Sequence, residues 1–242
     1  MKSEEFDRIR ALEDVHWWYK GRRHLLERLK ETLKLRNAII LDAGCGTGFA
    51  GRTLAECGAV IGLDASRFAF DESASAEINC LALIDKAPFS DNTFDLVVAM
   101  DLIEHLDDDQ TALNEMYRVC KDGGHLFITA PAYKRMWSAH DESLEHKRRY
   151  SLKEIICKIR KSGFEIEKSS HFVSTVFPAA FIYRMIRRKS SASSDLAPVA
   201  KPINAVLASI MKVEASIAWK VGLPFGMTAF VLGRKPEKDP FE

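Results

Sequence analysis

The sequence of 242 residues carries almost no net charge, because 35 lysines and arginines face 34 aspartates and glutamates. Such a balance gives no reason to expect a nucleic-acid partner. No apolar run reaches the length that spans a bilayer, and the mixed, acidic start MKSEEFDRIR is unlike a secretory signal. We therefore expect a cytoplasmic protein that does not bind nucleic acid.

Cysteines are few and scattered. They are odd in number and show no CxxC spacing, which argues against a zinc site and indicates a reducing compartment. The five are Cys45, Cys57, Cys80, Cys120 and Cys157. The sequence therefore predicts neither a disulfide framework nor a cysteine-bound metal.

Strands and helices alternate along the middle of the chain. Apolar runs at 38–44 and 59–66 end in turn residues, as buried parallel strands do. Helical patterns are expected at 47–58 and near 66–76, and Ser151, with a glutamate three residues later, predicts a capping box on a further helix. This alternation predicts an α/β fold built on a doubly wound parallel sheet.

The chain divides into four segments by pattern. Residues 1–36 are predicted to form an N-terminal helical cap whose two halves are interrupted by Gly21, and 37–171 to form the ligand-binding core. Residues 172–226 are predicted to be a helical insertion or lid, and 227–242 the last strand and tail. We find no internal repeat.

The stretch LDAGCGTG, residues 41–48, carries the strongest chemical signal. It has the spacing G-x-G-x-G, and Phe49 stands where a dinucleotide fingerprint would need glycine. Asp42 can accept a hydrogen bond from a cationic amine and would repel a pyrophosphate. Asp64, at the end of the next strand, suits ribose hydroxyls. The alternative is an ordinary strand–helix turn, but the set predicts a ligand with a ribose and an amino-acid-like end.

The chain resembles the class I S-adenosylmethionine-dependent methyltransferases over roughly 38–165. The motifs that carry the resemblance are LDAGCGTG, GLDAS, PFSDNTFDLVVAMDLIEHL, NEMYRVCKDGGHLFITAP and SGFEI. The resemblance implies a Rossmann-like, mostly parallel seven-stranded sheet and S-adenosyl-L-methionine as cofactor. The cofactor-contacting residues that it implies in these motifs are Asp42, Gly44, Cys45, Gly46, Asp64, Ala65, Met100 and Asp101.

One position departs from the family pattern. Members commonly carry an acidic residue five positions before a Pro-Phe pair, where it contacts the adenine amino group, but this chain has Leu83 there. Either Asp85 takes this role from a shifted loop, or the backbone of Ile84 holds the adenine.

The segment DLIEHL places Asp101, Glu104 and His105 at the mouth of the expected cleft. It resembles the acidic-x-x-Glu-His segment of ubiquinone-pathway O-methyltransferases, where such residues can hold a divalent metal. The alternative is a helix start with a hydrogen-bonded histidine. We assign no metal here and take His105 as a candidate base.

The segment WSAHDESLEHKRRYS, residues 137–151, follows the fifth expected strand. Ligands of such folds bind outside the carboxyl ends of the strands, so it is predicted to bind an anionic or hydroxyl-rich acceptor. Its pattern resembles a bacterial methyltransferase subgroup associated with cell-envelope or glycan pathways. The alternative is that its arginines only anchor the loop. The candidates are His140 and His146 as bases, and Trp137, Arg149 and Tyr150 as acceptor contacts.

The densest aromatic and basic cluster is HWWYKGRR, residues 16–23. We predict that it forms a lid over the cofactor, with Tyr19 stacking and Arg23, or Arg22, pairing with the cofactor carboxylate. Trp17 and its neighbour would exclude water. The alternative is that the two tryptophans attach the helix to the core.

The segment before the last strand is more apolar than an insertion requires. Residues 172–189 run from FVSTVFPAAFIYRMI into RRK, and 203–222 read as an apolar helix. This predicts contact with a membrane surface or a lid over an apolar acceptor; the alternative is a helical pair packed on the core or on a second subunit. The basic residues beside the apolar run are Arg184, Arg187, Arg188 and Lys189.

The function expected from these patterns is methyl transfer to a small or lipid-linked acceptor, with oxygen as the favoured atom. N- or C-methylation of a small metabolite and a non-catalytic cofactor-binding protein are the alternatives. A nicotinamide dehydrogenase is disfavoured by Phe49 and Asp42. The acceptor, the oligomeric state and any metal requirement stay open.

Overall fold

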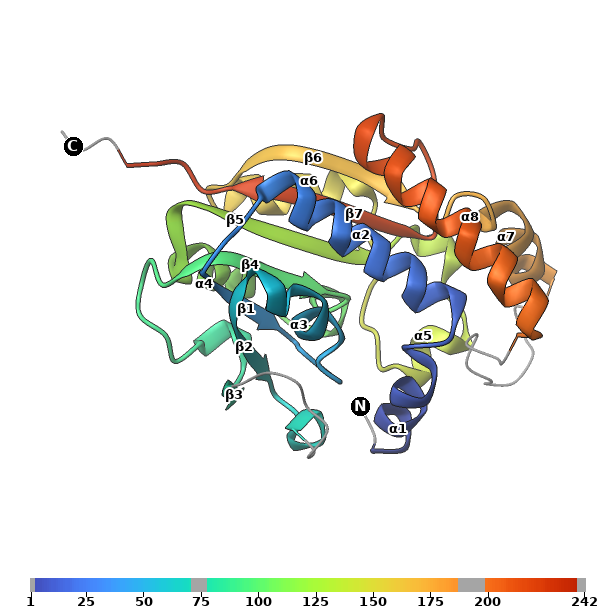
Figure 1. Ribbon diagram of the computed structural model, residues 1–242, viewed down its shortest axis with the longest axis horizontal. Coiled ribbons are helices and arrows are strands. Elements are labelled where there is room, and N and C mark those ends of the chain that lie inside the picture. The colour runs from blue at the N-terminus through green and yellow to red at the C-terminus, as the bar shows by residue number, and fades with distance from the viewer. Residues whose placement is uncertain (1–2, 71–77, 187–198, 239–242) are drawn as a thin grey trace.

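The computed structural model describes residues 3–70, 78–186 and 199–238, and a seven-stranded sheet runs through it (Figure 1). The strand order is β3-β2-β1-β4-β5-β7-β6, and only β7 runs antiparallel to its neighbours. The predicted mostly parallel, doubly wound sheet is thereby confirmed. The strands are β1 Ala38–Ala43, β2 Gly58–Asp64, β3 Ile78–Leu81, β4 Phe94–Met100, β5 Cys120–Pro131, β6 Glu165–Phe172 and β7 Thr228–Arg234.

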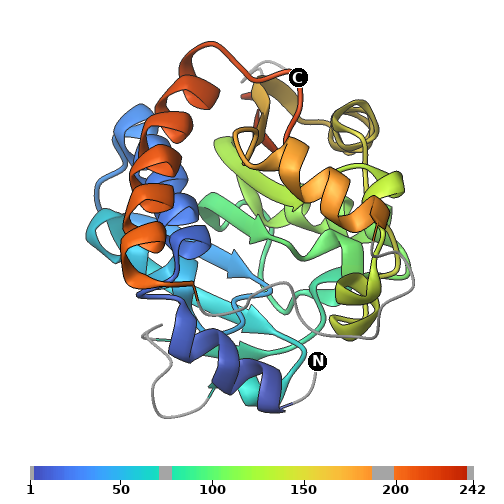
Figure 2. The ribbon, with the colours of Figure 1, turned by 90° about the vertical axis from the view of Figure 1, so that its right-hand side faces the viewer.

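Helices cover both faces of the sheet (Figures 1 and 2). They are α1 Ser3–Leu12, α2 Trp17–Leu33, α3 Phe49–Leu54, α4 Asp109–Val119, α5 Ala139–Ser143, α6 Leu152–Lys161, α7 Phe177–Ile186 and α8 Lys201–Lys220. Helices α2, α3 and α8 share one apolar cluster with the sheet, and α4 and α6 share another. Neighbouring residues such as Ile40 and Leu41 of β1 enter opposite clusters. The central strands β1 and β4 are therefore largely apolar, because both of their faces are covered.

The first helical break was predicted at the wrong place. Residues 13–16 separate α1 from α2, and His16 caps α2 by accepting a hydrogen bond from the Trp18 amide (3.3 Å). Gly21 lies inside α2, where a Cβ atom would come within 2.9 Å of the Met211 side chain. Glycine in a helix costs about 1 kcal/mol relative to alanine, but here it lets α2 pack closely on α8.

The helix predicted at 47–58 is shorter than expected. Helix α3 ends at Leu54, a 3₁₀ turn follows, and Gly58 is the first residue of β2. Its φ of +150° and the approach of the Ala38 backbone exclude a side chain, so this glycine begins a strand and does not end a helix. Of the helix predicted near 66–76, the described part is a 3₁₀ turn at Arg67–Phe70, and 71–77 lie outside the described residues.

Along the chain, helices α7 and α8 come between β6 and β7, two strands that pair directly in the sheet. The inner face of α8 packs on α2, and Trp219 donates a hydrogen bond to Thr32 Oγ1 (2.7 Å). Glu214 is buried and accepts hydrogen bonds from the Ser174 and Thr175 amides (2.6 and 2.9 Å). Among the described residues, no helix is both long and apolar enough to cross a membrane.

Candidate active site

A cavity of about 480 Å³ opens beyond the carboxyl ends of β1 and β4. Helices α1, α5, α7 and α8 surround this end of the sheet (Figure 2). The residues predicted from sequence that line it are Tyr19, Asp42, Gly44, Cys45, Gly46, Met100, Asp101, His105, His140, His146 and Arg149. Those that do not line it are Arg23, Asp64, Ala65, Ile84, Asp85, Trp137 and Tyr150.

The glycine loop after β1 is held against the end of β2. The Gly44 and Cys45 amides donate to the Leu63 carbonyl (2.7 and 3.1 Å), and the Gly46 amide donates to Asp64 Oδ2 (2.9 Å). Gly46 has a φ of +54°, and a Cβ atom added there would meet nothing closer than 4.0 Å. Bare backbone therefore faces the cavity, as a ligand lying along the loop requires.

Asp42 is the buried carboxylate of this loop. Its Oδ2 atom accepts a hydrogen bond from the Gly51 amide in the first turn of α3 (2.9 Å). Burial, reinforced by the charge of Asp64, raises the pKa of Asp42 to about 7, although Gly51 and Arg52 oppose the rise. A cationic group bound in the cavity would offset the free-energy cost of burying the ionised Asp42 carboxylate.

The residues predicted to hold the ribose and adenine lie beside the cavity. Asp64 accepts a second hydrogen bond from the Ser66 amide (2.8 Å), which fixes its carboxylate, and Ala65 is exposed. Ile84 is buried in a 3₁₀ turn. Within the described chain, Asp85 Oδ1 is buried without a hydrogen-bond partner, so this turn offers an unused acceptor atom.

The aromatic and basic stretch at the start of α2 forms one wall of the cavity. Trp17 and Trp18 line it with their rings edge to face at 5.8 Å, and Tyr19 packs on the Phe49 ring at the same distance. Before α2, Glu13 accepts a hydrogen bond from Thr47 Oγ1 of the glycine loop (2.5 Å). The N-terminal segment is thus fastened to the loop that it covers.

Arg22, the alternative to Arg23, is the arginine that reaches the cavity. It forms an ion pair with Asp101 at the end of β4. Arg23 instead pairs with Asp14 (2.8 Å) and lies over the Phe49 ring. Residues four apart share a helix face, so Arg22 follows Trp18 into the cavity whereas its neighbour turns outward.

The pKa values of Asp101 and Glu104 are shifted in opposite directions, although the two carboxyl groups lie close together. Burial disfavours the charge on Asp101, but Arg22 and Thr129 outweigh burial and hold its pKa below the usual value. Glu104 is fully buried, and its carboxylate has no hydrogen-bond partner on another described residue. Burial, followed by the negative charge of Asp101, raises the pKa of Glu104 well above its usual value.

Two histidines stand next to Glu104. The rings of His105 and His146 meet edge to face at 4.8 Å, and burial together with His146 lowers the pKa of His105 to about 4. One ligand atom each from Glu104, His105 and His146 lies within 4.8 Å of the other two. A proton on Glu104 and a divalent cation among these three residues are two ways to satisfy the buried carboxylate.

Asp141 lies in the segment singled out from the sequence but was given no role there, although it organises this part of the site. Its carboxylate is fully buried and accepts hydrogen bonds from His146 Nδ1 (2.9 Å), Arg149 Nε (2.6 Å) and the Ser138 amide (2.9 Å). Burial opposes its charge, but these donors hold the pKa of Asp141 far below the usual value. The ionised carboxylate places the proton of neutral His146 on Nδ1, leaving a lone pair on Nε2.

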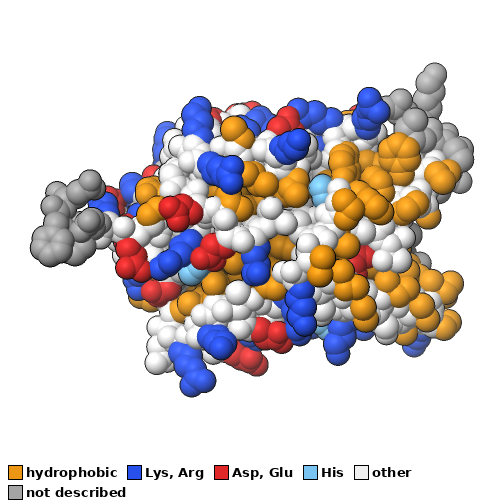
Figure 3. Space-filling view, turned by 90° about the horizontal axis from the view of Figure 1, so that it is seen from above, with side chains coloured by type: hydrophobic (Ala, Val, Ile, Leu, Met, Phe, Trp, Pro, Cys, Tyr) orange, Lys and Arg blue, Asp and Glu red, His pale blue; other side chains and the backbone are white. Residues whose placement is uncertain are grey.

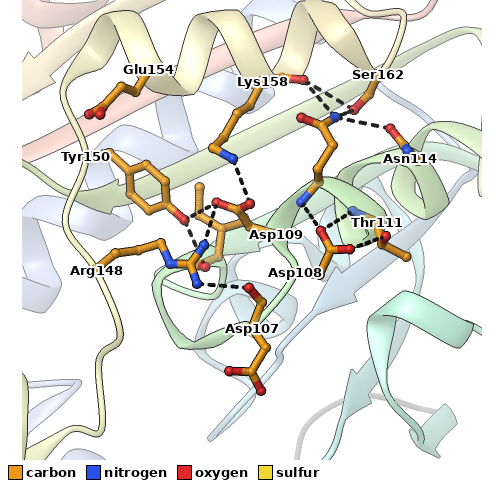
Figure 4. Close-up of polar contacts among 12 residues, drawn as sticks. Asp107, Asp108, Asp109, Thr111, Asn114, Arg148, Tyr150, Glu154, Lys158 and Ser162 are labelled. Atoms are coloured by element: carbon orange, nitrogen blue, oxygen red, sulfur yellow. Dashed lines mark hydrogen bonds and ion pairs between the residues drawn. The ribbon is translucent and has the colours of Figure 1, made fainter.

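Tyr150 and Arg148 anchor the loop that carries His146 (Figure 4). The Tyr150 hydroxyl donates to Asp109 Oδ2 (2.6 Å) and to the Ile103 carbonyl, and Arg148 donates to the Asp107 carbonyl (2.9 Å). Tyr150 is buried and does not line the cavity, and half-buried Trp137 also lies outside the lining. The structure thus gives Tyr150 and Arg148 contacts that hold the loop.

The part of the chain that carries this site is similar to known proteins. The family described as "Methyltransferase domain" matches residues 41–128, which include the glycine loop and the DLIEHL segment. A "probable S-adenosylmethionine-dependent methyltransferase" of Mycolicibacterium smegmatis is 27% identical over 170 residues, 66% of this chain and 63% of that protein. Residues 41–128 therefore match a methyltransferase domain, and the similar proteins include S-adenosylmethionine-dependent methyltransferases. The cofactor of this family is S-adenosyl-L-methionine, and the bare glycine loop fits it.

Other relatives are named as ubiquinone biosynthesis O-methyltransferases. A ubiquinone biosynthesis O-methyltransferase of Xanthomonas oryzae pv. oryzae is 28% identical over 52% of this chain and 60% of that protein. The chain spans less than two thirds of the length of the curated relatives that head the comparison.

Two solved structures share the fold. A methyltransferase of Haloferax volcanii, solved with the Trm112 methyltransferase activator, has a TM-score of 0.65, 19% identity and coverage of 98% and 96%. A methyltransferase of Thermotoga maritima has a TM-score of 0.61, 20% identity and coverage of 96% and 95%.

Proposed function

We propose that this protein transfers the methyl group of S-adenosylmethionine to a hydroxyl of a small or lipid-linked acceptor. The observation that carries the proposal is the cavity itself. The glycine loop, Asp42 and His146 all line it, and His146 is held from behind the lining by buried Asp141. The similarity to ubiquinone biosynthesis O-methyltransferases supports oxygen as the acceptor atom.

Some of the proposed cofactor contacts come from residues that line the cavity, and others come from residues outside its lining. Gly44, Cys45 and Gly46 present backbone to the methionine portion, and Asp42 accepts from its amino group. Outside the cavity lining, Asp64 contacts the ribose, Ala65 and Ile84 border the adenine, and Asp85 Oδ1 accepts from its amino group. When bound, the cofactor supplies an electrophilic methyl group on a sulfonium.

The wall formed by α2 closes this site from water. Tyr19 and the neighbouring tryptophans cover the cofactor. Arg22, already paired with Asp101, is the arginine placed to meet a cofactor carboxylate, and Arg23 supports Tyr19 through the Phe49 ring. Positioning an acceptor in line with the methyl can contribute several of the ~7–11 kcal/mol that orientation offers.

His146 is the base that best fits the geometry. Asp141 holds its ring and leaves Nε2 able to take the acceptor proton, whereas the lowered pKa of His105 makes that residue a weaker base. His140 and Arg149 line the same region and contact the acceptor. Among the candidate bases, His146 is therefore placed ahead of His105.

The acceptor side of the cavity is largely apolar. Helix α7 contributes Ala179 and Ala180, Val176 comes directly before this helix, and Met227 directly before the last strand. Apolar lining of this kind favours an acceptor with a hydrophobic portion next to its hydroxyl. A lipid-linked or isoprenoid-like acceptor is therefore favoured over a free sugar.

The test uses S-adenosylmethionine labelled on the methyl, the protein and a bacterial extract separated into organic, aqueous and macromolecular fractions. We expect label in the organic fraction, in an alkali-stable ether linkage. Label in the aqueous fraction would overturn the lipid-linked acceptor and keep the methyltransferase. Label found on nitrogen or carbon would replace O-methylation. Tight cofactor binding without label in any fraction would favour a non-catalytic protein.

The affinity for S-adenosylmethionine should depend on pH through Asp42. A carboxyl with a pKa of about 7 is mostly protonated at pH 6, so a cationic amino group must displace that proton. We expect affinity to rise about fivefold from pH 6 to 7 and to level off near pH 8, where α-amino groups lose their charge. Titration calorimetry at several pH values measures this.

Asp42→Asn is the matched control, because the amide oxygen can still accept from the Gly51 amide. The rise between pH 6 and 7 should vanish in this variant. An unchanged rise would mean that another group, such as Glu104, sets the pH dependence.

Removal of metal should leave methyl transfer intact. The raised pKa of Glu104 favours a proton on this carboxyl, and the Asp141–His146 pair needs no cation to act as a base. We expect less than a twofold change in rate after dialysis against EDTA. A loss that Mn²⁺ or Zn²⁺ restores, and that Glu104→Gln abolishes, would instead identify Glu104, His105 and His146 as cation ligands.

A further inference from the structure

Exposed apolar side chains are concentrated on one part of the molecule. Of the 13 large hydrophobic residues exposed in the described chain, seven lie between 182 and 225. Five of them form a row on the outer side of α8 and at its end, called here the apolar ridge: Ile203, Val206, Val213, Ile217 and Val221. Their spacing of three, seven, four and four residues keeps them on one helix face.

The fold does not need the apolar ridge. Met211, Ala215 and Trp219 on the opposite side of α8 already attach the helix to α2 and the sheet. In Figure 3, hydrophobic side chains gather on the half of the molecule that holds α7 and α8, whereas the other half mixes acidic and basic groups. A patch of this kind marks an interaction surface.

The exposed charged side chains of α8 itself are all basic. Lys201, Lys212 and Lys220 of α8 are exposed, and the one acidic residue in 199–226, Glu214, is buried with its carboxylate bonded to the Ser174 and Thr175 amides. A second copy docked on this face would bring lysines against lysines. Anionic lipid headgroups would instead pair with them while the ridge enters the acyl boundary.

The ridge begins beside the cavity. Asn204, next to Ile203, accepts a hydrogen bond from the amide of the cavity-lining Trp17 (2.8 Å) and donates one to the Val15 carbonyl (2.7 Å). Helix α7, which lines the cavity, lies at the same end of the molecule as α8 (Figure 2). A bilayer on this face would therefore lie next to the acceptor side of the cavity.

We propose that the apolar ridge and the lysines of α8 bind the protein to an anionic membrane surface, from which a lipid-linked acceptor enters the cavity. The role in acceptor delivery rests on the proposed function, whereas the binding itself does not. The basic residues named from the sequence are not needed for this argument, since 187–189 lie outside the described residues.

The test is co-sedimentation of the full chain with vesicles of phosphatidylcholine, with or without phosphatidylglycerol. We expect binding that needs phosphatidylglycerol and weakens as salt is raised. Replacing Lys201, Lys212 and Lys220 together with glutamine should weaken it at least tenfold, and Val206→Ser with Val213→Ser should do the same with the charges intact. All five side chains are exposed, so the variants should fold.

The matched control makes the same change of charge elsewhere. Lys86, Lys153 and Lys161 are exposed and lie away from α8, two of them on α6 across the sheet. Their replacement with glutamine should leave binding within about twofold. Equal loss in both triple variants, or no binding by the wild-type chain, would overturn the proposal.

Three further results are informative. A wild-type dimer that the two serine substitutions dissociate would assign the apolar ridge to a second copy and overturn the membrane surface. Transfer of label without vesicle binding would remove only the membrane surface. Vesicle binding without transfer of label would remove the proposed function and leave the surface.

Discussion

Replacing Gly46 with alanine should weaken S-adenosylmethionine binding by at least about 100-fold, or ~2.7 kcal/mol, while the fold is largely kept. The added methyl group would meet no protein atom within 4.0 Å, so it would project into the open space where the cofactor is proposed to lie. The φ of +54° costs a non-glycine residue about 1–2 kcal/mol, a loss of several degrees in melting temperature for a chain of this length. Calorimetry and thermal unfolding measure the two effects separately.

The control for Gly46→Ala is Gly222→Ala. Gly222 follows α8 with a φ of +82°, and an added methyl group there would meet nothing closer than 3.9 Å. The two variants should lose similar stability, but only the first should lose cofactor affinity. Full affinity in Gly46→Ala would show that the cofactor does not lie along this loop.

Local signals predicted most of the fold. The capping box of α6 was predicted because Ser151 and Glu154 bond each other's backbone amides within one turn, and the structure confirms both bonds. Such contacts depend on residues three apart and can be read from any sequence. The strands of the core were equally accessible, since both faces of a covered parallel sheet must be apolar.

Contacts between distant segments could not be read in this way. Gly21 was taken as a break because glycine disfavours helices locally, but its position is decided by Met211, 190 residues later. The antiparallel insertion of β7 between β5 and β6 depends on the path through α7 and α8 and leaves no mark in the strand itself. The sequence pattern predicts that a helix or strand forms, whereas the segment it packs against is known only from the folded structure.

The candidate site likewise contains some residues that the sequence predicts and others that only the folded structure identifies. The glycine loop and the histidines could be predicted, because their residue types carry the chemistry. The choice between Arg22 and Arg23 could not, since it depends on how α2 is turned toward Asp101. Asp141 could be noticed in the sequence as an acidic residue five positions before His146. Only the folded structure shows that it is buried and accepts hydrogen bonds from both His146 and Arg149.

The largest effect on turnover is expected from His146→Ala. Removing the base should lower kcat by about 10²–10⁴-fold. S-adenosylmethionine affinity should stay within about twofold, because we propose that His146, a lining residue outside the glycine loop, contacts the acceptor and not the cofactor. The initial rate of label transfer into the accepting fraction measures this. Added imidazole should restore part of the rate, since it can occupy the vacated space and take the acceptor proton.

His24→Ala is the control, because His24 lies on α2 and does not line the cavity. Asp141→Asn should also slow transfer, but it should destabilise the fold as well, since Arg149 is buried and would lose its charged partner. The two variants therefore separate the base from the residue that positions it: imidazole should rescue His146→Ala and leave Asp141→Asn slow.

The competing assignment is His105, another of the histidines named as a candidate base from sequence. Its lowered pKa of about 4 keeps it neutral at pH 7, but such a group holds a transferred proton weakly. We therefore expect His105→Ala to slow transfer less than His146→Ala does, mainly through the lost edge-to-face contact between the two rings. A larger loss in His105→Ala, with no imidazole rescue of His146→Ala, would move the proton transfer to His105 and leave Asp141 with a purely structural part in holding the loop.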